Sequence, residues 1–226
     1  MDDIKDIWKD NAYRGLWGEV VEGDIYKIRE LKFIPDVIFD IGANVGTFSK
    51  FAHELYPSAL IIAVEPDKDN IDNFNKFHKP SENNIVLHNM AIGKGEAYRD
   101  VKAVNGSHEC YLSRVMGYED ITESSSLKLS DVRTTLLDFI VNGWVKKGQK
   151  YVLKIDIEGS ETAIFTHEPS MKALINADYI AMELHYFAMT PNGVLKVMEM
   201  TKKALQSLEA THYIQHEHPM FYATKR

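Results

Sequence analysis

The sequence is poor in cysteine, in basic charge and in long apolar runs, and each shortage excludes a class of protein. Cys110 is the only cysteine among 226 residues, so no disulfide can form within the chain. The net charge of −7 argues against binding to DNA, and also against RNA, because either needs a basic surface to replace phosphate counterions. No stretch reaches the roughly 18 consecutive apolar residues that would span a membrane.

The composition is that of a globular domain in a reducing compartment. Apolar residues make up 45% of the chain and charged residues 26%, which allows a large buried core. The acidic N-terminus, MDDIKDIWKD, lacks the apolar centre of a signal peptide. With one cysteine, this predicts a cytoplasmic protein. The length predicts a lead-in or cap over residues 1–30 and a single domain over residues 31–226. It leaves the oligomeric state open, and a homodimer is compatible with it.

Apolar stretches alternate with helical patterns along the chain. The expected parallel strands are Val37–Ile41, Leu60–Val64, Ile85–Asn89, Tyr151–Ile157 and Tyr179–Leu184. The expected helices start at Asn44, Asp67, Leu136, Glu161 and Thr190-Pro191. Thr211–Gln215 and Met220–Ala223 should close the chain as an antiparallel hairpin. This alternation predicts an α/β fold with a doubly wound, mostly parallel, seven-stranded Rossmann-like sheet.

An insertion interrupts this alternation at about residues 96–135. Glu96–Val104 is expected to pair with Ser126–Val132, and a polar loop, Asn105–Ser125, lies between them. Loops of this length in compact domains are often functional.

A glycine-containing turn follows the first expected strand. Residues 40–46 read DIGANVG, and glycines allow a backbone to approach a ligand closely. Glu65 and Pro66 end the next strand, where a carboxylate can accept hydrogen bonds from the two hydroxyls of a ribose. This order favours a site for a nucleoside-bearing cofactor, with an ordinary strand–turn–helix corner as the structural alternative.

The chemistry of this turn separates two cofactor classes. A dinucleotide site requires the pattern G-x-G-x-x-G, which is absent here, and binds pyrophosphate at the helix N-terminus. Asp40, two residues before the first glycine, would repel pyrophosphate and attract a cation. S-adenosylmethionine, which carries a sulfonium and an ammonium group, therefore fits the turn better than NAD.

Charged residues also occur in the fourth expected strand. Lys154, Asp156 and Glu158 share one face of that strand by its period of two, and burying three charges is costly unless they are paired or used. We interpret Asp156 and Glu158 as catalytic candidates because they lie at the ligand edge of the sheet. A purely structural pairing of Lys154 with Asp156 or Asp40 is the alternative.

Glu183 and His185 share a face at the end of the fifth expected strand. His185 is the best general-base candidate because its ordinary pKa lies near neutrality. With Asp156 and Glu158, these two residues also have the ligand chemistry for Mg²⁺ or Mn²⁺. Their spacing does not by itself demand a metal, so none is predicted.

At these residues the sequence resembles the FkbM family of S-adenosylmethionine-dependent methyltransferases. The matching pieces are VIFDIGANVGTFS, AVEPD, NMAIG, LKIDIEGSE and MELH, and the resemblance spans about residues 19–186. The LKIDIEGSE piece is the most specific to the family, whereas the first two pieces are shared more widely among methyltransferases. The 105–130 loop departs from the family pattern, which leaves the substrate open.

The resemblance implies O-methylation of a hydroxyl on a sugar or natural-product acceptor. Asp40, Gly42, Asn44 and Gly46 would line the methionine part of the cofactor, Glu65 with Pro66 would hold the ribose, Asn89, Met90 and Ala91 would border the adenine, and Asp156 would lie near the sulfonium with Glu158 close by. The acceptor would be a small molecule or a glycan. Two alternatives stay open, namely an NAD-type oxidoreductase on the same sheet and a non-catalytic module that only binds S-adenosylmethionine.

Overall fold

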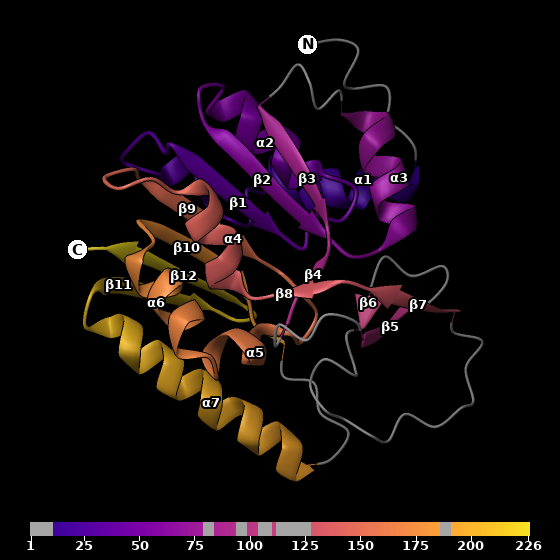
Figure 1. Cartoon of the computed structure of the whole chain (residues 1–226). Helices are drawn as coiled ribbons and strands as arrows, with labels where there is room; N and C mark the ends of the chain where they lie inside the picture. The colour runs from indigo at the N-terminus through magenta and orange to yellow at the C-terminus, as the bar shows by residue number, and fades with distance from the viewer. Residues whose placement is uncertain (1–10, 79–83, 94–98, 104–109, 112–127, 186–190) are drawn as a thin grey trace.

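A computed structural model of the chain shows one seven-stranded sheet between two layers of helices (Figure 1). It describes residues 11–78, 84–93, 99–103, 110–111, 128–185 and 191–226. The strands of the main sheet are β1 (Val37–Ile41), β2 (Leu60–Glu65), β3 (Ile85–Asn89), β9 (Tyr151–Ile155), β10 (Tyr179–Glu183), β11 (His212–Glu217) and β12 (Met220–Lys225). The α-helices are α1 (Asn11–Trp17), α2 (Thr47–Leu55), α3 (Lys68–Phe77), α4 (Leu137–Trp144), α5 (Glu161–Phe165), α6 (Glu168–Asn176) and α7 (Pro191–Glu209).

The strand order is β11-β12-β10-β9-β1-β2-β3. The neighbours from β10 to β3 pair in parallel, whereas β12 is antiparallel to both β10 and β11. This confirms the predicted doubly wound sheet with a C-terminal antiparallel hairpin. The strand order reverses direction between β1 and β9, and ligands bind at such switch points, beyond the carboxyl ends of the strands.

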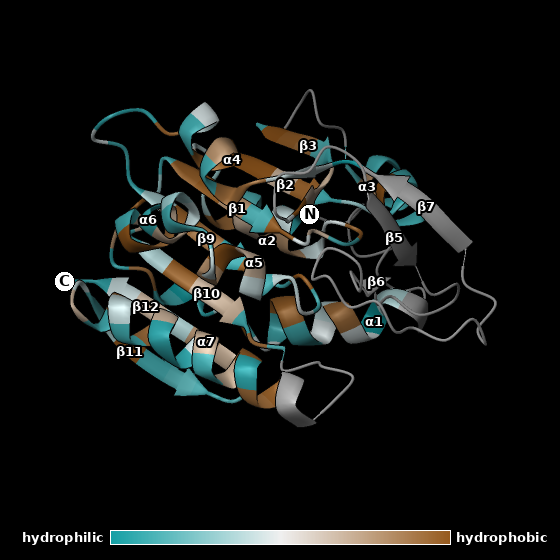
Figure 2. Ribbon diagram, turned by 60° about the horizontal axis from the view of Figure 1, so that its bottom comes forward, coloured by the Kyte–Doolittle hydropathy of each residue, from teal (hydrophilic) through white to brown (hydrophobic). Residues whose placement is uncertain are grey.

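The alternation of side chains along β1 explains how the sheet is buried on both faces. Phe39 and Ile41 pack in the core formed with α4, α5 and α6. Ile38 packs in the opposite core, formed with α2, α3 and the lead-in segment. All five residues of β1 are buried, as a central parallel strand requires. Figure 2 shows β1, β2 and β3 largely in brown, whereas the edge strand β11 is teal.

The described part of the lead-in segment packs onto the α2 face of the sheet. After α1 it forms a π-helical turn over Gly18–Glu22 and a 3-10 turn over Ile28–Glu30. Val20, Tyr26 and Ile28 are buried in the same core as α2. The proposed division of the chain at residue 30 stays a prediction.

Several elements end where the backbone adopts a left-handed conformation. Helix α2 begins at Thr47 rather than at Asn44, because Asn44 and Gly46 have φ values of 52° and 88°. Strand β9 ends at Ile155 rather than at Ile157, because the chain turns at Glu158, with a φ of 51°. The helix expected from Glu161 is two helices, α5 and α6.

The insertion carries short strands beside the main sheet (Figure 1). Strand β5 (Arg99–Ala103) pairs antiparallel with β7 (Lys128–Val132) and with β6 (Cys110–Tyr111). Nearer the main sheet, β4 (Ala91–Ile92) pairs in parallel with β8 (Thr134–Thr135). Most of the predicted loop Asn105–Ser125 lies outside the described residues. Within the described part of the chain, no helix is both long and apolar enough to cross a membrane.

Candidate active site

A hollow of about 60 Å³ lies beyond the carboxyl ends of β1, β2 and β9. The sequence-predicted residues that line it are Gly42, Asn44, Glu65, Pro66, Met90, Ala91, Asp156 and Glu158. The predicted site therefore has a shared cavity at the sheet's switch point.

The turn between β1 and α2 uses its own amides. Each backbone N–H from Gly42 to Gly46 donates a hydrogen bond within the protein. Gly42 and Ala43 donate to the Val64 carbonyl, and Asn44 donates to the Glu65 carboxyl group. Val45 donates to Asn44 Oδ1 and Gly46 to the Ala43 carbonyl, and all five bonds are 2.7–3.0 Å long. A pyrophosphate cradle instead requires amides that point at the ligand. The amides of this turn therefore do not form a pyrophosphate cradle.

The two glycines of this turn are required by the protein's own packing. A Cβ at Gly42 would lie 1.8 Å from the carbonyl oxygen of Asp156, and one at Gly46 would lie 2.3 Å from His78 Nε2. Both glycines also have positive φ values, 81° and 88°. The sequence analysis attributed these glycines to the approach of a ligand, whereas the structure shows that β9 and the segment after α3 already exclude a side chain.

Glu65 is almost fully buried at the edge of the hollow, with an exposed fraction of 4%. Its carboxyl oxygens accept hydrogen bonds from the backbone N–H groups of Asn44 (2.8 Å) and Asp67 (2.9 Å) and from the Asn70 side chain (3.3 Å). Burial raises the pKa of Glu65 to about 7, although these donors stabilise its ionised form. Glu65 thus connects the glycine turn to the turn that follows β2.

Asp40 and Lys154 form a buried ion pair beneath the hollow. The two residues are direct neighbours on β1 and β9, and Lys154 Nζ lies 3.1 Å from Asp40 Oδ1. Ser49 donates to the other oxygen of Asp40 at 2.7 Å, and Lys154 donates to the Gly42 carbonyl at 2.6 Å. Burial alone would lower the pKa of Lys154, but Asp40 and Asp156 raise it, so the ammonium stays charged. The structural pairing considered for Lys154 is therefore present.

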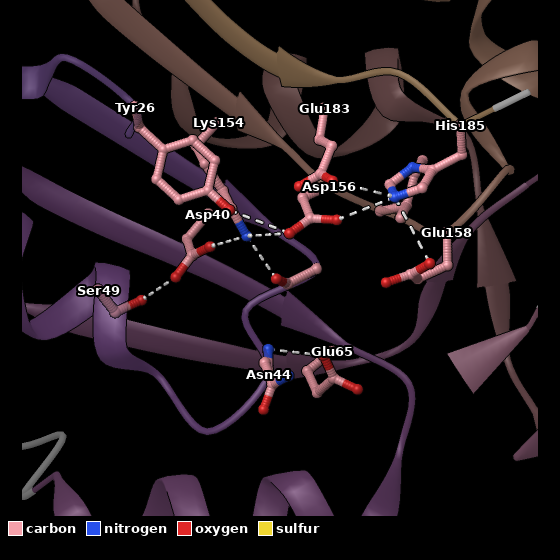
Figure 3. A network of polar contacts seen from close by, with 12 residues as sticks. Tyr26, Asp40, Asn44, Ser49, Glu65, Lys154, Asp156, Glu158, Glu183 and His185 are labelled. Atoms are coloured by element: carbon pink, nitrogen blue, oxygen red, sulfur yellow. Dashed lines mark hydrogen bonds and ion pairs between the residues drawn. The ribbon is translucent and has the colours of Figure 1, made fainter. Parts of the chain in front are cut away.

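Asp156 is positioned by residues from two elements (Figure 3). The Tyr26 hydroxyl donates to Asp156 Oδ2 at 3.0 Å, and Lys154 Nζ lies 4.0 Å from the same oxygen. Burial, followed by the charge of Asp156, raises the pKa of Tyr26 well above its ordinary value, so its hydroxyl remains a donor. The Asp156 side chain, 24% exposed, thus faces the hollow in a fixed orientation.

His185 lies among acidic side chains that follow β9 and end β10 (Figure 3). Its Nε2 is 3.5 Å from Glu158, 3.7 Å from Glu183 and 3.9 Å from Asp156. Its Nδ1 is 2.9 Å from Glu161 Oε1, which comes from the first turn of α5. Burial alone would lower the pKa of His185, but the Glu161 hydrogen bond and the surrounding carboxyl groups raise it to about 9. The imidazole is therefore charged at neutral pH.

Some predicted residues support the hollow without lining it. Asp40 lies in β1 beneath the hollow, and Gly46 ends the first turn, packed against His78. Asn89 donates to the backbone carbonyls of Glu65 and Pro66, at 3.3 and 3.2 Å, and so supports the end of β2. His185 lies beyond Asp156 and Glu158. The assigned cofactor and catalytic roles of all these residues stay predictions.

The sequence analysis missed two contributors to the site. Tyr26 precedes Asp156 by 130 positions, so only the tertiary fold brings them together. Glu161 is buried, with an exposed fraction of 2%, and orients His185. An acidic residue in the first turn of a helix usually stabilises the helix dipole, which hides this second role.

Comparisons with solved structures gave distant similarities. A putative rRNA methylase from Clostridium thermocellum is 11% identical over 91% of this chain and 94% of its own, with a TM-score of 0.48. The precorrin-6y C5,15-methyltransferase from Geobacter metallireducens GS-15 is 15% identical over 91% and 88%, with a TM-score of 0.43. Aeropyrum pernix fibrillarin with bound S-adenosyl-L-methionine is 12% identical over 92% and 76%, with a TM-score of 0.45.

Comparisons of sequence gave a family assignment. No curated protein matches the sequence. Residues 40–214 match the methyltransferase FkbM domain, and this match runs from the end of β1 through β10 and includes every residue that lines the hollow, and His185. The chain therefore belongs to the FkbM family of methyltransferases.

Proposed function

We propose that the chain transfers a methyl group from S-adenosylmethionine to a hydroxyl of a sugar or another small-molecule acceptor. One observation carries the choice of cofactor. The amides of the first turn are used within the protein, while Glu65, Asp156 and Glu158 present carboxyl groups to the hollow. This arrangement suits a cationic nucleoside ligand and does not suit the pyrophosphate of NAD.

The lining residues fit the parts of such a ligand. Glu65 would accept hydrogen bonds from the ribose, and Met90 and Ala91 would border the adenine. Gly42 and Asp156 would face the methionine part. When bound, S-adenosylmethionine supplies a methyl group that is already activated by its positive sulfur.

The remaining task of the protein is to align the acceptor and remove its proton. Asp156 is fixed by Tyr26 and Lys154 and is the first candidate to orient the acceptor hydroxyl. Asp156 or Glu158 receives the proton as the oxygen–methyl bond forms and the sulfur–methyl bond breaks. His185 is charged at neutral pH, so its predicted role as a base requires that the positive charge of bound S-adenosylmethionine lowers its pKa.

The proposal can be tested by methyl transfer to a panel of hydroxylated acceptors. We expect label from methyl-labelled S-adenosylmethionine to appear on a sugar or natural-product hydroxyl, and Asp156→Asn to lower turnover more than affinity for S-adenosylhomocysteine. Equal turnover of Asp156→Asn and wild type would remove Asp156 from the mechanism. Cofactor binding without transfer to any acceptor would favour the non-catalytic module.

The single cysteine supports a cytoplasmic location as part of this proposal.

A further inference from the structure

Three side chains beside the hollow bring possible metal-ligand atoms close together. Single ligand atoms from Asp156, Glu158 and His185 all lie within 4.8 Å of one another. Two of the residues follow β9 and the third follows β10, so the site does not depend on one local turn. We propose that Asp156, Glu158 and His185 Nε2 bind a divalent cation of the Mn²⁺ type.

The orientation of His185 is the first argument. A metal-binding histidine almost always donates its other ring N–H to a carboxylate or a carbonyl. Glu161 Oε1 lies 2.9 Å from His185 Nδ1, which leaves Nε2 directed at Asp156 and Glu158. Glu161 is outside the proposed ligand set, so this contact is independent of the three converging atoms.

The concentration of acidic groups around His185 is the second argument. Glu161 is 2% exposed, and within the described residues its Oε2 has no hydrogen-bond partner. Glu183 adds a further carboxyl group 3.7 Å from His185 Nε2. The nearby Lys154 is shared with Asp40 and the Gly42 carbonyl. A divalent cation at Nε2, in place of the imidazolium proton, would bring more positive charge to these four carboxyl groups.

The ligand set indicates the class of cation. Carboxylate oxygens suit Mg²⁺, Ca²⁺ and Mn²⁺, whereas an imidazole nitrogen favours the transition metals. Mn²⁺ accepts both kinds of ligand. The side chains of Asp156 and Glu158 are 24% and 26% exposed, which leaves coordination positions open to water or to an acceptor.

The cation would also favour one class of acceptor, and this part of the inference rests on the proposed function. Asp156 and Glu158 line the hollow, so the cation would lie at its edge, within reach of an acceptor. An acceptor with two neighbouring oxygens, such as a vicinal diol, could occupy two coordination positions together. The cation would then lower the pKa of the hydroxyl to be methylated.

Direct Mn²⁺ binding tests the inference without any acceptor. We expect calorimetry and electron paramagnetic resonance to show one Mn²⁺ per chain, with binding weakened at least tenfold in Asp156→Asn, Glu158→Gln and His185→Gln. Glu161→Gln should weaken it by about 10–100-fold through the orientation of His185. Glu209→Gln, an exposed acid at the end of α7, is the matched control and should bind as wild type does.

Two outcomes would overturn the inference: no Mn²⁺ binding by the wild type, or equal binding by the wild type and all three ligand variants. Thermal unfolding and S-adenosylhomocysteine binding of each variant would show that it is folded. The test is separate from the proposed function, because a chain that binds S-adenosylhomocysteine but no Mn²⁺ refutes only the metal site. A chain that binds Mn²⁺ but no S-adenosylhomocysteine refutes only the cofactor.

Discussion

At the scale of single residues, the charge balance beneath the site depends on Lys154. Asp40 has no exposed surface, and Lys154 is its cationic partner at 3.1 Å. A buried ion pair contributes little compared with an apolar pair, but removing one partner leaves an uncompensated charge in the core. Lys154 therefore stabilises the fold. It also contacts the site, because it lies near Asp156 and donates a hydrogen bond to the Gly42 carbonyl.

We predict that Lys154→Met lowers the free energy of unfolding by about 3–5 kcal/mol, measured by urea denaturation. Lys147→Met, at an exposed lysine, is the control and should change it by less than about 0.5 kcal/mol. The double variant Asp40→Asn/Lys154→Met should recover part of the loss because it no longer buries a lone charge. A loss for Lys154→Met no larger than that of the control would contradict this account.

Glu65 gives the proposed cofactor site a pH dependence. Burial raises its pKa to about 7, and a ribose hydroxyl donates best to the ionised carboxylate. Below this pKa the ionised fraction falls about tenfold per pH unit. We therefore expect affinity for S-adenosylhomocysteine to fall between about pH 8 and about pH 6 in calorimetric titrations, while Glu65→Gln should bind weakly at every pH. A wild-type affinity for S-adenosylhomocysteine that rises as the pH falls would contradict this prediction.

At the scale of elements, tyrosine hydroxyls bind the lead-in segment to the sheet and to the end of α2. Tyr222, Tyr179 and Tyr56 donate to the backbone carbonyls of residues 25, 26 and 28, at 2.6, 3.0 and 2.8 Å. These bonds fix the backbone on both sides of Tyr26. The segment thereby holds the Tyr26 hydroxyl against Asp156, which links the lead-in to the proposed chemistry.

We predict that the triple variant Tyr56→Phe/Tyr179→Phe/Tyr222→Phe increases amide hydrogen exchange over residues 24–30. Each lost bond should cost about 1 kcal/mol, and more where the carbonyl stays buried. Tyr213→Phe, at an exposed tyrosine on β11, is the control and should leave exchange unchanged. Equal protection of residues 24–30 in the triple variant and the wild type would show that packing alone holds the segment.

Element boundaries show where sequence patterns stop being informative. Apolar runs predicted the parallel strands of the main sheet, because central strands buried on both faces leave a strong signal. The terminal hairpin was predicted from the turn at Pro219. The ends of β9 and α2 could not be predicted, since they depend on positive φ values at Glu158 and Asn44 that side-chain patterns do not reveal. The division between α5 and α6 was missed for a related reason. His167 caps α6 by accepting from the Ser170 N–H, a role that histidine rarely signals in a sequence.

At the scale of the whole molecule, the strand order brings distant residues to one edge of the sheet. Asp156 and Glu65 were predictable as neighbours of one site because the carboxyl ends of parallel strands meet there. The contacts of Tyr26 with Asp156 and of Glu161 with His185 were not predictable, because they depend on how loops fold back over that edge. The sequence thus indicates where the site lies. Only the structure shows which residues orient its side chains.

Calorimetric titration of the wild-type chain with S-adenosylhomocysteine, and separately with NAD, tests the central claim most directly. The account predicts saturable binding of one S-adenosylhomocysteine per chain and no binding of NAD, because the amides of the first turn are already used. Saturable binding of NAD, with none of S-adenosylhomocysteine, would contradict it.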